Sequence, residues 1–239
     1  MNRISRTAFA VLAALTMGAG HAAAQTVSSP FRYLDRKTSV EAFGGYLFTD
    51  AEVTIDTANA AEFGPQSAPV FGVRAARRIT GPLSAELMVG FSPSERRIIA
   101  AAEGQDSAFT GPLDTGSTVG APLLMTEAGV RFHLTGDRTY RGFAPFILAT
   151  GGLVFDVGGA SAAEDSLPED ERFDFGPALA VGAGTGADWY LGERLSLRAE
   201  ASYRLWRMSV PQGFTFRRTG ESTEWNGVAG LTLGAAFHF

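Results

Sequence analysis

The chain has 239 residues, with 20 Arg and Lys against 25 Asp and Glu and a formal net charge of −5. Phosphate binding needs a basic face, so this balance argues against a nucleic-acid partner. The chain has no cysteine, which excludes disulfides and thiolate metal ligands.

Residues 1–24 have the three-part pattern of a cleaved signal peptide. Arg3 and Arg6 precede an apolar run, Ala8–Leu15, and alanines at 22–24 supply a small-residue cleavage site. The run is shorter than the roughly 20 residues that a spanning helix needs, so we expect export and cleavage rather than anchoring. Cleavage removes two arginines and no acid, which leaves 18 Arg and Lys against 25 Asp and Glu and a net charge of −7.

Residues 25–38 are polar, include one proline and show no alternation. They are interpreted as a periplasmic N-terminal lead-in to the first strand. A docking motif around Phe31–Leu34 is the alternative.

Segments with a two-residue hydrophobic period fill most of the remaining chain, as expected of strands with one apolar face. The alternation is clearest at the C-terminus and recurs along 71–76, 83–91, 127–134, 179–184 and 195–205. Two segments are less regular. The phase of Ser39–Thr49 is assigned mainly by Glu41, and Phe143–Val157 is apolar on both faces. In the C-terminal segment 225–239 one face is apolar and suits lipid, whereas the other suits a polar interior. The apolar face carries Trp225, Gly227, Ala229, Leu231, Leu233, Ala235, Phe237 and Phe239. The opposite face carries Asn226, Gly230, Thr232, Gly234 and His238.

The connections alternate strictly in length. Short ones at 80–82, 135–142 and 191–194 separate long ones at 50–67, 92–120, 158–172 and 209–223. Short periplasmic turns and long extracellular loops are typical of an outer-membrane meander. Backbone groups in hydrocarbon must all be paired, so such a sheet must close on itself. The sequence therefore predicts an all-β fold over residues 39–239, a single closed antiparallel up-and-down transmembrane β-barrel of about eight strands; a soluble sandwich or periplasmic barrel is the alternative.

Aromatic residues are predicted to cluster at the strand ends, where they would form interfacial belts. Those near the loop ends are Tyr46, Phe48, Phe91, Phe155, Phe173, Phe175, Tyr203 and Trp225, and those near the turn ends are Phe132, Phe143, Trp189, Phe237 and Phe239.

Charged residues of both signs fall on the inward faces in equal numbers: Arg74, Arg78, Arg131, Arg198 and Arg204 with Glu41, Glu86, Glu127, Asp188 and Glu200. The turn at 80–82 places Glu86 opposite Ala76 and diagonal to Arg74 and Arg78, and a similar count brings Asp188 near Arg198. An interior of about eight strands holds only its own side chains, so these charges are expected to pair and plug it. A narrow or gated pore is the alternative.

The last ten residues, GLTLGAAFHF, have a terminal phenylalanine preceded by apolar residues at every second position: Leu231, Leu233, Ala235 and Phe237 before Phe239. They resemble the closing-strand signal of bacterial outer-membrane barrels, which implies recognition by the barrel-assembly machinery. With the strand count, residues 39–239 resemble the small barrels related to the transmembrane domain of outer-membrane protein A. The resemblance implies an integral outer-membrane location, in contact with lipid and lipopolysaccharide. No peptidoglycan-binding domain is expected after Phe239, so no cell-wall tethering role is carried over.

Catalysis is not expected. Some small barrels of this appearance act on lipid A, and lipid A deacylases use a histidine, a serine and a carboxylate. His133 is followed by Leu134 and Thr135 rather than by a serine two positions on, and His238 lies at the periplasmic end. No metal or cofactor is expected either; the acidic run at 164–171 suits a divalent cation, but such runs are more typical of solvated loops.

These observations favour a structural or adhesion-like role carried by the extracellular loops. The long second loop contains Ile98–Ala102, which is expected to extend its strand above the membrane and offer a pairing edge to an unknown surface ligand. A small passive or gated pore is the second hypothesis, and a lipid A-modifying enzyme is the third.

Overall fold

The computed structural model describes residues 31–50, 52–54, 60–62, 64–103, 109–158, 167–169, 171–173, 176–209, 211 and 223–239. The predicted signal peptide, half of the acidic run and Phe175 lie outside the described residues. No helix in the described part of the chain is long and apolar enough to cross a membrane.

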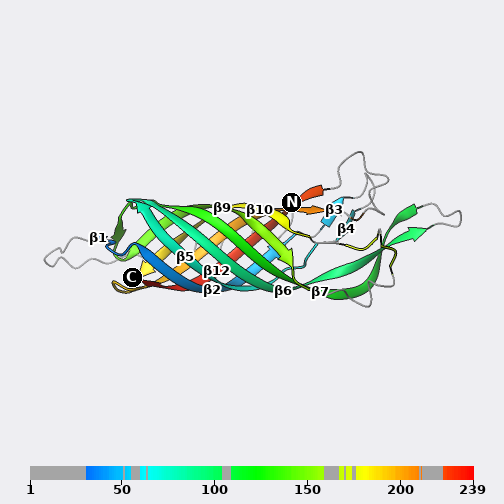
Figure 1. The fold of residues 1–239 in the computed structure, drawn as a ribbon, viewed down its shortest axis with the longest axis horizontal. Coiled ribbons are helices and arrows are strands. Elements are labelled where there is room, and N and C mark those ends of the chain that lie inside the picture. Colours follow the sequence, from blue (N-terminus) through cyan, green and yellow to red (C-terminus); the bar gives the residue numbers. More distant parts are fainter. Residues whose placement is uncertain are drawn as a thin grey trace, which may run out of the picture. The chain divides into compact units, whose positions relative to one another are not determined.

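Eight long strands form the barrel wall (Figure 1): β2 (Thr38–Thr49), β5 (Ala68–Thr80), β6 (Leu83–Glu103), β7 (Phe109–His133), β9 (Phe143–Asp156), β10 (Ala178–Tyr190), β11 (Leu195–Ser209) and β12 (Thr223–His238). Each pairs antiparallel with the next along the chain, including β7 with β9 across the short β8. The last strand pairs with the first, with Phe237 opposite Val40 and Val228 opposite Thr49. The predicted closed, up-and-down barrel is confirmed.

The lead-in is not a plain linker. Its residues Phe31–Tyr33 form strand β1, which pairs with β8 (Arg138–Tyr140) in the connection between β7 and β9. The Leu34 amide donates to the Asp137 carbonyl (2.9 Å), and the Arg78 amide donates to the Lys37 carbonyl (2.7 Å). The lead-in thus satisfies backbone groups that the barrel wall leaves free. Three residues are too few for a two-residue period to appear, which is why the sequence pattern missed this strand.

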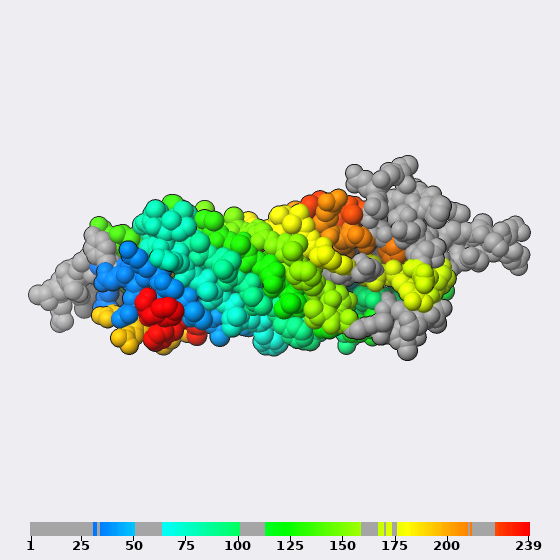
Figure 2. All heavy atoms as spheres, viewed as in Figure 1, coloured from blue at the N-terminus to red at the C-terminus, as the bar shows by residue number. Residues whose placement is uncertain are grey.

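We name the barrel's two ends by their connections. The turn end carries the turns at 81–82 and 191–194 together with β1 and β8, and the opposite loop end carries the long connections. At the turn end the lead-in lies beside the C-terminal residues (Figure 2), where the Phe239 amide donates to the Thr38 carbonyl (3.0 Å). The two short strands β3 (Glu52–Thr54) and β4 (Ala60–Glu62) form a separate two-stranded sheet within the first long connection.

The second long connection is mostly strand, not loop. Strand β6 continues to Glu103 and β7 starts at Phe109, so residues 92–103 and 109–120 of the predicted loop 92–120 form the two strands of a hairpin that projects beyond the barrel (Figure 1). The predicted strand extension through Ile98–Ala102 is confirmed. Buried Ser92, Ser94 and Arg96 alternate with exposed neighbours. The two-residue alternation of buried and exposed side chains therefore continues here, although the buried residues are no longer apolar.

The outer surface of the wall is apolar. Phe71, Leu87, Leu231 and Leu233 are each more than half exposed, and the predicted interfacial rings Tyr46, Phe48, Phe91, Phe132, Phe143, Trp189, Tyr203, Trp225, Phe237 and Phe239 also face outward. Phe155 is half-buried. Phe173 is buried, and the Arg96 guanidinium lies 5.4 Å from its ring centroid. A side chain that covers a buried cation cannot also face the interface, so the prediction for Phe173 was wrong.

Replacing a lipid-facing leucine by arginine should destabilise the barrel. Leu231 lies near the middle of β12, so Leu231→Arg should lower the free energy of unfolding by about 2–4 kcal/mol in bilayers. Leu113 has the same exposed fraction, 54%, but lies on the projecting hairpin. Leu113→Arg is therefore the matched control, expected to change stability by less than about 0.5 kcal/mol. Urea unfolding in phospholipid vesicles measures both, and equal losses would contradict a lipid-facing wall.

Candidate functional site in the barrel lumen

Arg198 is the centre of a buried charge network. Its Nη1 lies 2.7 Å from Glu86 Oε1 on β6, and its Nη2 lies 2.6 Å from Glu200 Oε2 on its own strand. Glu41 Oε2 on β2 is 3.5 Å from the same guanidinium. All four side chains are at most 5% exposed, so three strands are linked through groups that water does not reach.

Other ion pairs extend this network across the lumen. Arg131 lies 3.1 Å from both Glu86 and Asp188, and the His133 ring lies 3.3 Å from Asp188. The further pairs are Arg74 with Glu41 (2.7 Å), Arg74 with Glu200 (3.6 Å) and Arg204 with Glu127 (2.7 Å). Buried charges persist only when they are paired, so these contacts explain how the barrel tolerates so many of them.

The sequence predicted the register but not the partners. Glu86 lies opposite Ala76 and Asp188 lies opposite Arg198, as the turn counts required. Yet Glu86 pairs with Arg198 and Arg131 rather than with its diagonal neighbours. In a narrow barrel the far wall is within reach of long side chains, and a carboxylate held between two guanidiniums is better compensated than one facing a single neighbour.

Arg78 does not join the network, although its position on the inward face predicted that it would. It lies at the turn end, where its guanidinium donates to the carbonyl of Leu34 in the lead-in. No ion pair joins it to a carboxylate of the described residues. The lead-in, which has no strand pattern in its sequence, binds this side chain through the Leu34 carbonyl and so keeps it out of the network.

Phe146 separates two cations of the network. Its ring centroid lies 4.3 Å from the Arg198 guanidinium and 5.3 Å from that of Arg131. The ring fits because Gly186 lies beside it: a Cβ on this glycine would be 2.6 Å from the ring and 2.2 Å from the Ala199 carbonyl oxygen. The apolar inner face of β9, irregular in sequence, therefore serves as packing for cations.

Toward the loop end the lumen is apolar, not polar as predicted. Large side chains such as Trp206, Leu123 and Val154 are at most 1% exposed there. They belong to a single buried cluster with Leu47, Val70, Met125, Met208 and Val228. Hydrophobicity alone does not separate a lipid-facing residue from a buried one, so the alternation did not reveal this cluster.

The sequence did not reveal a serine–histidine contact at the turn end. Ser196 Oγ and His238 Nε2 are 2.7 Å apart, although 42 residues separate them in the chain. Ser196 is only 1% exposed, so its oxygen is closed to a substrate. No group of three or more His, Asp or Glu residues in the described ranges is arranged to hold a metal ion.

The network should be far more sensitive to mutation than a surface pair. Arg198→Met leaves buried carboxylates uncompensated and should lower the free energy of unfolding by about 3–5 kcal/mol. Arg97 pairs with Asp114 at 2.6 Å on the exposed hairpin, so the control Arg97→Met should cost less than about 1 kcal/mol. Urea unfolding in vesicles compares them, and a small loss for Arg198→Met would contradict the role of the network.

Comparison with known proteins supports the fold alone. No protein-family model and no curated protein matches the sequence. Among solved structures, Neisserial surface protein A matches with a TM-score of 0.50 and 12% identity, over 84% of this chain and 97% of that one. Outer membrane protein OprG from Pseudomonas aeruginosa matches with a TM-score of 0.51 and 11% identity, over 85% and 97%. The chain therefore has the fold of the small bacterial outer-membrane β-barrels.

Proposed function

We propose that this protein is an integral outer-membrane barrel whose lumen is closed and whose role is to bind a partner at the cell surface. The observation that carries this proposal is the projecting β6–β7 hairpin. The barrel below it acts as an anchor, and the loop end presents the binding surface.

The hairpin is built as an ordered projection. Arg97 pairs with Asp114, the Asp114 carboxylate accepts from the Gly116 amide (2.8 Å), and Thr115 Oγ1 donates to the Ile98 carbonyl (2.9 Å). These contacts hold its two strands together without the barrel wall. Residues 113–118 are all exposed.

One edge of the hairpin is available for strand addition. Strand β7 pairs with β9 from His133 up to Leu123, and the Val157 amide still donates to the Pro122 carbonyl (2.8 Å). In the described part of the chain, no strand pairs with that edge between Phe109 and Ala121. An extended peptide can add to such an edge through backbone hydrogen bonds.

The charge of the loop end indicates the partner's chemistry. The four long connections hold 14 Asp and Glu against five Arg. Charge complementarity steers association and disfavours partners of like charge, so a basic protein surface is the favoured partner.

We propose no catalytic activity. The Ser196–His238 pair is buried, and His133 contacts Asp188 inside the network rather than a nucleophile. Lipopolysaccharide incubated with the barrel should keep its mass, and a mass change abolished by His133→Ala would establish the enzyme instead.

Surface binding should depend on the hairpin. In the test variant an Asn-Gly turn replaces residues 98–116, and bacteria displaying it should be retained severalfold less on lysozyme-coated surfaces than bacteria displaying the intact barrel. Albumin-coated surfaces control for charge, because albumin is acidic. Heat-modifiable migration on gels verifies that the variant folds. Equal retention of the two strains, or no retention above the empty strain, would contradict the proposal.

The closed lumen should not conduct. Next to the network the lumen leaves a cavity of about 10 Å³, lined by residues that include Arg74, Glu86 and Arg204. Such a space holds about one water molecule. Purified barrel in a planar bilayer should therefore give no steady single-channel current. A steady current that changes with Glu86→Gln would favour the pore instead.

A further inference from the structure

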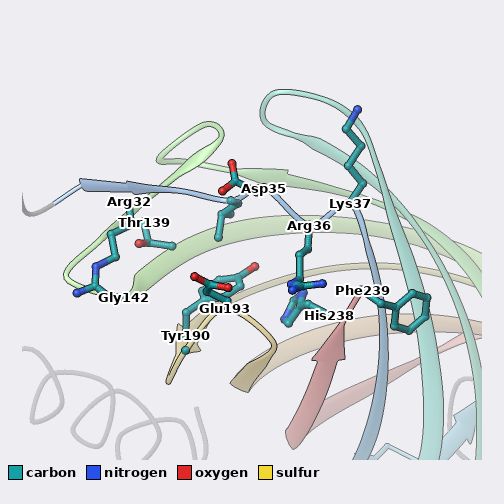
Figure 3. A pocket seen from close by; sticks show the side chains of 12 residues that line it. Arg32, Asp35, Arg36, Lys37, Thr139, Gly142, Tyr190, Glu193, His238 and Phe239 are labelled. Carbon is teal, nitrogen blue, oxygen red and sulfur yellow. The ribbon is translucent and has the colours of Figure 1, made fainter.

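Two adjoining cavities lie at the turn end, opposite the surface assigned above to partner binding. The outer one, of about 650 Å³, lies between the lead-in and the turns, and its lining includes Arg36, Tyr190, Glu193 and His238 (Figure 3). The inner one, of about 10 Å³, reaches the base of the lumen. Arg36, Lys37, Tyr190 and His238 line both, so the two cavities share part of their walls.

The inner cavity is strongly cationic. Arg36, Lys37, Arg78 and Arg131 line it, together with hydroxyl and imidazole groups, whereas no carboxylate does. Of these four cations only Arg131 has an ion pair within the described residues, with Asp188 and Glu86. In Figure 3 Arg36 points toward His238, whereas Asp35 and the amine of Lys37 point away, so Arg36, Arg78 and Arg131 supply the positive charge of the cavity.

One buried donor at this cavity lacks an acceptor. Arg78 Nε is buried and has no hydrogen-bond partner among the described residues. Farther along the lumen, Arg74, Arg198 and Arg204 each pair with a carboxylate. A buried donor without an acceptor is costly, so this unmatched donor and the positive charge around it indicate a site for an anionic acceptor.

We propose that the turn end binds a phosphate-bearing molecule. Phosphate oxygens enter the inner cavity beside Arg36 and Arg78, and the rest of the molecule occupies the outer one. Arginine suits this group because its planar guanidinium offers several donors to phosphate oxygens. The inner cavity has room for about one water-sized group, so it admits an oxygen of the phosphate rather than a larger body. Short turns face the periplasm in outer-membrane barrels, so the proposed ligand is either a soluble phosphate ester or the headgroup of an inner-leaflet phospholipid.

Isothermal titration of the folded mature barrel in uncharged detergent tests this site. The probes are inorganic phosphate and glycerol 3-phosphate, for which we expect saturable binding, tighter for the ester because it also fills the outer cavity. Arg36→Gln should weaken binding at least tenfold. This variant leaves the Arg78–Leu34 contact in place, so the lead-in stays docked.

Arg77→Gln is the matched control. Arg77 adjoins Arg78 in β5, but it is exposed on the outer face and lines neither cavity. Its replacement removes the same charge at the same end of the barrel and should leave binding unchanged. Absence of saturable binding of either probe, or equal weakening by Arg77→Gln and Arg36→Gln, would overturn the proposal.

A second comparison identifies the source of the phosphate. In micelles of an uncharged, phosphate-free detergent the barrel should bind glycerol 3-phosphate as above. If phosphatidylglycerol added to the micelles suppresses that binding, and uncharged diacylglycerol does not, the phosphate belongs to a lipid headgroup. If binding is the same with and without phosphatidylglycerol, the ligand is soluble.

Discussion

Closure of the sheet is the constraint on which the rest of this structure depends. A bilayer offers no partners to backbone N–H and C=O groups, so β12 must pair with β2 as fully as each strand pairs with its chain neighbour. Closure with eight strands makes the lumen narrow, and a narrow lumen forces charged side chains from opposite walls into contact. The buried network around Arg198 follows from this geometry.

The lumen is divided along its length into regions with different means of stabilisation. Toward the turn end, cations and carboxylates compensate one another, with Phe146 packed between Arg131 and Arg198. Toward the loop end, side chains such as Trp206 and Leu123 exclude water by packing alone. Both regions fill the interior, which leaves the two ends of the barrel as the surfaces available to partners. The loop end carries the β6–β7 hairpin and an excess of acids, whereas the turn end carries unpaired arginines around a cavity.

The lead-in has two structural roles at the turn end. By pairing with β8 and accepting from Arg78, it removes that arginine from the ion-pair network and makes one wall of the outer cavity. A segment with no recognisable pattern therefore shapes a cavity whose basic side chains Arg36 and Arg78 have no carboxylate partner among the described residues.

The sequence by itself determined the closed meander, its eight strands and the face on which residues of the regularly alternating strands lie, because a two-residue period and the length of each connection are local properties. Turn lengths also predicted the register that places Glu86 opposite Ala76. The tertiary structure alone decided which cations pair with Glu86 and Asp188. It also decided that Arg78 binds the lead-in, that Phe173 is buried and that Ser196 contacts His238. These contacts join residues across the lumen or from segments far apart in the chain, and their distances depend on barrel diameter and stagger, which no local pattern encodes.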